Sequence, residues 1–251
     1  MTEKSLQKVF HKERVEKAAP QKAENVSPEG NLEEIIGYRF RDPSILTQAL
    51  THTSYANEHR KEKVSHNERL EFLGDAVLEI CSSEYLFMHY PEKPEGEMTR
   101  MRASMVCEPT LALCAREFGL PSYLRLGRGE ELSGGRRRDS IVSDALEALI
   151  GAIYLDGGFE EARRFIASFI LEDIENKRLF VDSKTMLQEY AQGREEKVEY
   201  ILDREEGPDH DKRYYVTARV GTECAAQGCG HSKKAAEQQA AYQALRQLRE
   251  G

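Results

Sequence analysis

The strongest constraint in this sequence is an apolar run, Ile141 to Leu155, that covers every face of a helical wheel. A helix of this kind is buried on all sides. Asp144 and Glu147 interrupt the run at positions i and i+3, so both carboxylates project from one face. No Lys or Arg lies between Arg138 and Arg163. Because burying an ionised carboxylate is costly unless it is paired or binds a metal, the run predicts a buried helix that needs a cation.

A second run, His66 to Ile80, repeats this pattern. Glu68, Glu71 and Asp75 stand at i, i+3 and i+7, on one face of the expected helix. The expected apolar stripe beside them consists of Leu70, Leu73, Val77 and Ile80. Like charges stacked one turn apart are destabilising, and no Lys or Arg occurs from Leu70 to Glu92. This run also favours a bound cation.

Four carboxylates on two helices can converge on one site, and the set consists of Glu71, Asp75, Asp144 and Glu147. A site made only of carboxylate oxygens suits Mg²⁺, with Mn²⁺ as a plausible substitute. Two such ions suit the hydrolysis of a phosphodiester by an activated water. A di-iron helical bundle is the alternative use of paired acids, but the sequence lacks the Glu-x-x-His pairs of that class.

Both acidic runs resemble motifs of the ribonuclease III family. The nine residues Asn67 to Asp75 closely resemble the family's signature motif, and Ser143 to Gly151 is similar to its second acidic motif. The run Ala49 to Tyr55 also resembles the family. The resemblance covers nearly the whole chain after about residue 31, and it implies an all-α endonuclease domain that acts on double-stranded RNA.

The resemblance also implies roles for individual residues. Glu71, Asp75, Asp144 and Glu147 fall on the metal-binding positions, and Asp75 and Glu147 are expected to be catalytic. Glu68 falls on a secondary acid that steadies metal-bound water or the RNA. The family is dimeric, so Phe72 is either a core aromatic residue or a side chain that packs into the twin subunit. Products with 5′-phosphate and 3′-hydroxyl ends are expected, with ribosomal and messenger RNA precursors as substrates.

The rest of the first domain reads as helices. Residues 1–30 are predicted to be a flexible extension, and residues 31–175 the catalytic domain. Gly74 lies inside an expected helix, which suggests that another backbone approaches it closely. We expect His52 to be structural, because no nucleophile motif adjoins it. Arg136, Arg137 and Arg138 precede the second acidic helix, and are either phosphate ligands or simply exposed.

The pattern changes class after a predicted linker at residues 176–184. Residues 185–251 read as α-β-β-β-α and resemble a double-stranded-RNA-binding domain, so the whole chain is expected to be multidomain. Lys233 and Lys234 open the last helix, where they can meet phosphates. By resemblance, the residues that reach 2′-hydroxyls in the minor groove are Gln188, Glu189, Gln192 and His210.

The net negative charge of the chain is unusual for a protein that binds RNA. The net charge of the whole chain is −8, and the part from Asp182 onward has 11 Lys and Arg against 13 Asp and Glu. The affinity of this domain for RNA is therefore expected to be modest and strongly salt-dependent. Its clustered acids are expected to face away from the RNA, and they are Glu195, Glu196, Glu205 and Glu206.

Composition favours a soluble globular protein, with 39% hydrophobic and 32% charged residues. The absence of an apolar run near about 18 residues predicts that the chain does not span a membrane. With no apolar leader and five irregularly spaced cysteines, a cytoplasmic location is expected. The prediction is a Mg²⁺-dependent endoribonuclease that forms a homodimer and needs no organic cofactor. The alternative is a non-catalytic protein that binds double-stranded RNA.

Overall fold

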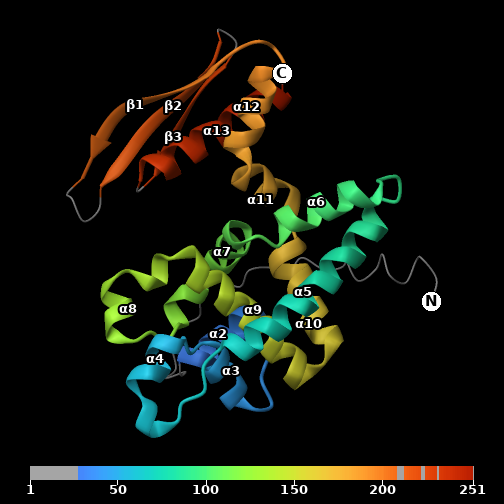
Figure 1. Ribbon diagram of the computed structural model, residues 1–251, viewed down its shortest axis with the longest axis vertical. Coiled ribbons are helices and arrows are strands. Elements are labelled where there is room, and N and C mark those ends of the chain that lie inside the picture. The colour runs from blue at the N-terminus through green and yellow to red at the C-terminus, as the bar shows by residue number, and fades with distance from the viewer. Residues whose placement is uncertain (1–27, 208–211, 222–223, 231, 251) are drawn as a thin grey trace. The chain divides into compact units, whose positions relative to one another are not determined.

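The computed structural model describes residues 28–207, 212–221, 224–230 and 232–250 (Figure 1). One compact unit ends at Glu172 and a second begins at Asp173. Most of the predicted extension, residues 1–27, lies outside the described residues. None of the described helices is both long enough and apolar enough to cross a membrane.

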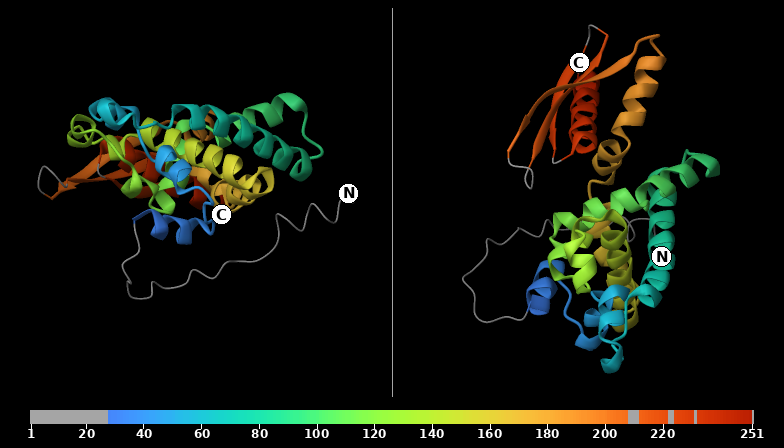
Figure 2. Two further views of the ribbon diagram at one scale, coloured as in Figure 1. Left: turned by 90° about the horizontal axis from the view of Figure 1, so that it is seen from below. Right: turned by 60° about the vertical axis from the view of Figure 1, so that its left-hand side comes forward.

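The first unit is entirely helical in its described part, which confirms the predicted all-α class (Figures 1 and 2). Its α-helices are α2 (Pro28–Ile36), α3 (Pro43–Ala49), α4 (Thr53–Glu58), α5 (Glu68–His89), α6 (Glu95–Met105), α7 (Glu108–Glu117), α8 (Arg128–Leu132), α9 (Asp139–Gly157) and α10 (Phe159–Ile166). Short 3₁₀ turns are η1 (Arg60–Glu62), η2 (Leu120–Tyr123) and η3 (Gly135–Arg137), and η4 (Ala167–Leu171) is a π-helical turn.

Helix α9 is the centre of this unit (Figure 1). Every residue from Ala148 to Ile153 is buried, and six consecutive residues point in all directions around a helix. Helices α3, α5, α7 and α10 pack against it. The predicted buried helix is therefore confirmed, and its two acids, Asp144 and Glu147, are half-buried.

Helices α5 and α9 cross at two glycines. A Cβ atom on Gly74 would lie 1.8 Å from the carbonyl oxygen of Glu147, and one on Gly151 would lie 2.2 Å from that of Leu70. Both distances are shorter than any real Cβ contact, so only glycine allows the helices to come this close. The close approach predicted from Gly74 is confirmed.

Asp156, near the C-terminal end of α9, forms hydrogen bonds with the segment that leads into α3. The carboxylate of Asp156 accepts a hydrogen bond of 2.6 Å from the hydroxyl of Tyr38. It also accepts bonds of 2.9 and 3.0 Å from the backbone N–H groups of Arg41 and Asp42. Asp42 in turn caps α3 by accepting from the N–H of Ser44. One carboxylate thus joins the central helix to the N-terminal helices.

The predicted linker differs from what the structure contains. Apart from Asp182, residues 176–184 are helical, in α11 (Ile174–Val181) and at the start of α12 (Ser183–Gln192). Ile174 and Leu179 are buried, and Leu179 belongs to the core of the second unit. The charges of this segment indicated a solvated connection, but Lys177 is buried as well. The change of unit falls instead at Asp173, whose backbone is left-handed at φ 58°.

The second unit has the predicted α-β-β-β-α order, preceded by α11 (Figure 1). Its sheet has the antiparallel order β1-β2-β3, formed by β1 (Val198–Glu206), β2 (Arg213–Val220) and β3 (Cys224–Gly230). Helix α13 (Lys233–Glu250) packs closely on β3. A Cβ atom on Gly228 of β3 would lie only 2.2 Å from the backbone nitrogen of Ala240 in α13. Small side chains on both elements therefore permit the contact.

We expect Gly151→Ala to lower the free energy of unfolding of the first unit by roughly 1–3 kcal/mol, the usual cost of overpacking. Denaturant unfolding followed by far-ultraviolet circular dichroism measures this change. Gly96→Ala is the matched control, because Gly96 is also helical and a Cβ there would meet no atom within 4 Å. Equal stability of the two variants would contradict the close crossing of α5 and α9.

Candidate functional site

Three of the four predicted metal-binding acids meet in the structure. Glu71 comes from α5, and Asp144 and Glu147 come from adjacent turns of α9. One carboxylate oxygen from each residue lies within 4.8 Å of the other two. The crossing at Gly74 and Gly151 brings the two helices close enough for this. Three half-buried carboxylates from two rigid helices are a donor set that suits a hard divalent cation.

Asp75, the fourth predicted acid, is placed differently. Its side chain is exposed, and it does not belong to the group of three. Its charge is nevertheless close enough to raise the pKa of both Glu71 and Glu147. Glu68 lies one turn before Glu71, with its side chain exposed and 3.7 Å from a ring nitrogen of His66. Both residues thus border the group of three.

Burial is the main reason why these carboxylates resist ionisation. Burial, followed by repulsion from Asp75, Asp144 and Glu71, raises the pKa of Glu147 to about 8. Burial also raises the pKa of Glu71 and that of Asp144. Within the described part of the chain, no Lys or Arg forms an ion pair with any of the four acids. A bound cation would remove this repulsion.

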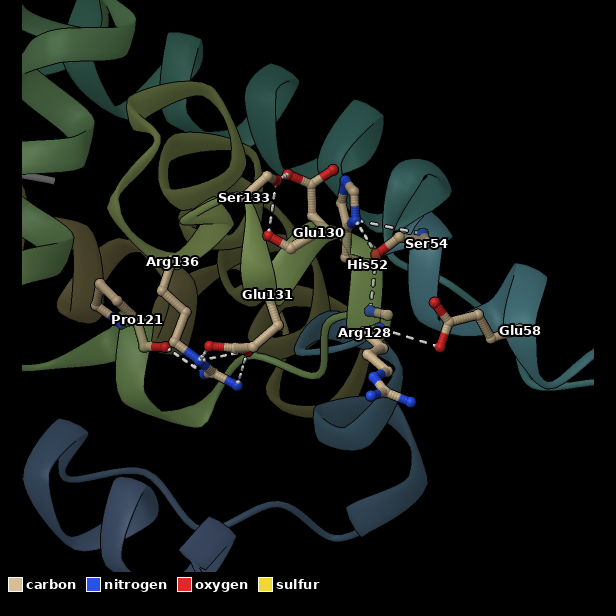
Figure 3. Close-up of polar contacts among 10 residues, drawn as sticks. His52, Ser54, Glu58, Pro121, Arg128, Glu130, Glu131, Ser133 and Arg136 are labelled. Atoms are coloured by element: carbon tan, nitrogen blue, oxygen red, sulfur yellow. Dashed lines mark hydrogen bonds and ion pairs between the residues drawn. The ribbon is translucent and has the colours of Figure 1, made fainter.

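The arginine loop before α9 is held by its own acids (Figure 3). Arg136 bonds to both carboxylate oxygens of Glu131 at 2.8 Å and donates to the carbonyl of Pro121 at 2.7 Å. Arg138 pairs with Glu130 at 2.9 Å. Two of the three arginines therefore stabilise the loop, a possibility that the predicted alternatives, phosphate contact and plain exposure, did not include. Arg137 is exposed.

His52 has the predicted structural role (Figure 3). Its Nδ1 caps α4 by accepting from the N–H of Ser54, and it lies 2.8 Å from the hydroxyl of Ser54. That hydroxyl accepts from the N–H of Gly127, and the carboxylate of Glu58 accepts from the N–H of Arg128. These bonds tie α4 to the start of α8. His52 therefore supports the loop that leads to α9.

Phe72 is exposed over 81% of its surface, so the interpretation as a core aromatic residue is wrong. Two other large apolar side chains of α5 are also exposed, Ile80 at 58% and Phe87 at 69%. Ile80 belongs to the expected apolar stripe, of which Leu70 and Val77 are buried. The spacing 72, 80, 87 repeats at about two helical turns per step, which places the three on one side of α5. This period is the sequence signal for an apolar surface.

The predicted RNA-binding residues lie on exposed parts of the second unit. Gln188, Glu189 and Gln192 are exposed on α12, and Lys233 and Lys234 are exposed in the first turn of α13. His210 lies outside the described residues. One contact was not expected, because Lys233 lies 3.5 Å from a carboxylate oxygen of Glu205. Glu205 therefore does not face away from this surface.

We expect Glu147→Gln to stabilise the metal-free protein by roughly 1–3 kcal/mol at pH 8, after allowance for partial exposure of the side chain. The raised pKa makes ionised Glu147 unfavourable in the folded state, so stability is lost as pH rises from about 4.5 to about 8. Denaturant unfolding in EDTA at pH 5 and pH 8 measures the effect. The two proteins should converge at pH 5, and a constant difference would contradict the assigned cause.

Comparison with known proteins agrees with this arrangement. The model of a family described as ribonuclease-III-like matches residues 42–174, and that of the double-stranded RNA binding motif matches residues 183–248. The Ribonuclease 3 of Caldanaerobacter subterraneus is 49% identical over 221 residues, which cover 86% of this chain and 96% of that relative. The Ribonuclease 3 of Desulforamulus reducens is 50% identical over 217 residues, or 85% and 88% of the two chains.

A solved structure gives the same result for the first unit. The nuclease domain of ribonuclease III from Campylobacter jejuni is 42% identical, with a TM-score of 0.52. The match covers 56% of this chain and 94% of that domain. The helical unit thus coincides with the match to the nuclease family, and the unit that follows it coincides with the match to the RNA-binding motif. The chain belongs to the ribonuclease III family.

Proposed function

We propose that this protein is a metal-dependent endonuclease that hydrolyses both strands of double-stranded RNA. The observation that carries the proposal is the meeting of Glu71, Asp144 and Glu147 at the crossing of α5 and α9. The same chain contains the double-stranded RNA binding motif. The names of the relatives support the same activity.

Mg²⁺ is the proposed metal, with Mn²⁺ as a substitute, because all the donors are carboxylate oxygens. Glu71, Asp144 and Glu147 would hold the ion, and Asp75 would reach it from the next turn of α5. A bound ion would supply an activated water for the attack and charge stabilisation for the leaving 3′ oxygen. The products then have 5′-phosphate and 3′-hydroxyl ends. No organic cofactor is needed.

Two acids are proposed as catalytic residues and one as an auxiliary. Glu147 is one of the three acids that meet at the helix crossing, and Asp75 is exposed where RNA can approach. Glu68 would orient water or RNA at the edge of the site, since its side chain projects into solvent one turn before Glu71.

The second unit would hold the duplex by its shape. The exposed side chains of Gln188, Glu189 and Gln192 on α12 suit hydrogen bonds to 2′-hydroxyls, and the resemblance adds His210 to this set. Lys233 and Lys234 would contact phosphates from the N-terminal turn of α13. Because RNA and DNA duplexes differ in groove shape and 2′-hydroxyls, this surface would select RNA.

A homodimer is proposed through α5. Phe72, Ile80 and Phe87 form an apolar surface of the kind that marks protein interfaces. The matched Campylobacter jejuni structure is described as flexible in a region involved in dimer formation. We propose ribosomal and messenger RNA precursors as substrates, in the cytoplasm. The competing function, a non-catalytic RNA-binding protein, leaves the half-buried acids without a use.

The cleavage test uses a labelled RNA duplex, with single-stranded RNA and a DNA duplex as controls. We expect wild type to cut only duplex RNA, in Mg²⁺ and not in EDTA. Glu147→Gln should lose cleavage by at least about 100-fold while still binding the duplex, because it removes a metal ligand. The control Glu92→Gln removes an exposed acid outside the group and should cut normally. Binding without cleavage by wild type in either metal would support the non-catalytic alternative.

The dimer test replaces Phe72 with Ala. We expect the molar mass measured by light scattering to fall from dimer toward monomer at low micromolar concentration, because a central aromatic anchor is lost. Leu132→Ala is the control, since Leu132 on α8 is 79% exposed and lies away from α5 in sequence. If both variants stay dimeric, the interface lies elsewhere.

A further inference from the structure

Two lysines of the second unit are paired with one acid. Lys212, just before β2, lies 2.9 Å from one carboxylate oxygen of Glu205. Lys233, the first residue of α13, lies 3.5 Å from the other oxygen. Both ammonium groups lie about as far from the ring of Tyr214, at 6.0 and 5.9 Å. The end of β1, the start of β2 and the start of α13 thus meet at a single carboxylate.

Glu205 is fully charged at neutral pH. The hydrogen bond from Lys212, followed by the charges of Lys212 and Lys233, holds the pKa of Glu205 below its usual range. Lys233 remains open to solvent, with 59% of its side chain exposed, against 32% for Glu205. An approaching phosphate can therefore reach Lys233, where it also comes close to the carboxylate of Glu205.

We infer that Glu205 limits the affinity of this unit for the RNA backbone by occupying Lys233 and Lys212 when RNA is absent. The inference rests on the proposed function, in which Lys233 contacts phosphate. A phosphate and a carboxylate compete for the same ammonium group, and like charges held close together repel. Lys233 then contributes less than a free lysine would to the release of counterions from RNA.

The neighbouring Glu206 provides a matched comparison. Its carboxylate pairs with Arg204 at 2.7 Å, whereas the ion pairs of Lys212 and Lys233 described above are with Glu205. Successive residues of a strand point to opposite faces of the sheet. Glu205→Gln and Glu206→Gln therefore change the net charge equally, one at the lysines and one away from them.

Binding of the full chain to an RNA duplex of about 20 base pairs tests the inference. EDTA prevents cleavage, and fluorescence anisotropy gives Kd between about 50 and 200 mM salt. We expect Glu205→Gln to bind roughly threefold more tightly than wild type, the effect of one exposed ion pair. Its plot of log affinity against log salt should be steeper by about one, as for one more phosphate contact. Glu206→Gln should change both quantities less.

The variant Lys233→Gln distinguishes the proposed RNA-binding role of Lys233 from the inferred effect of Glu205 on it. Lys233→Gln should weaken binding. When Glu205→Gln is added to Lys233→Gln, the increase in affinity should be less than half of the increase that Glu205→Gln causes in the wild-type chain. If wild type does not bind the duplex, or if Lys233→Gln binds normally, the proposed RNA-binding role fails and the inference fails with it. If wild type binds but Glu205→Gln matches Glu206→Gln or binds more weakly, only the inference is overturned.

Discussion

The cluster of acidic side chains proposed to bind a metal depends on how closely two helices can approach each other. At the crossing of α5 and α9, the space beside Gly74 and Gly151 is filled by backbone carbonyls of the facing helix. Side chains one turn away from this point are therefore brought together, and these are Glu71 and Glu147. A larger residue at either glycine would separate the helices, and with them the carboxylates.

The same packing explains the electrostatics of the site. Because α9 is buried on all sides, little water reaches Glu147, and burial is the largest cause of its raised pKa. No neighbouring Lys or Arg among the described residues relieves the charge. Arg136 and Arg138, which precede α9, are already bonded to Glu131 and Glu130. The fold thus keeps its cations away from the acids that a metal would need.

Periodicity predicted the parts of this structure that depend on burial. The apolar run around Asp144, the glycine at position 74 and the change to strands after residue 192 each follow from local pattern. Contacts between distant charged residues could not be predicted this way, because no period relates Glu205 to Lys233 or Arg136 to Pro121. The helical state of residues 176–184 was missed for a similar reason, since its apolar residues pack on a partner that is distant in sequence.

The bonds at Asp156 have a consequence for cooperativity. This residue lies near the C-terminal end of α9, and it binds the chain between α2 and α3 through Tyr38, Arg41 and Asp42. The N-terminal helices cannot open locally without breaking bonds to the helix that holds Asp144 and Glu147. Opening of this segment and disruption of the acidic cluster are thus coupled events, so a cation bound by α5 and α9 would also slow amide exchange in the segment before α3.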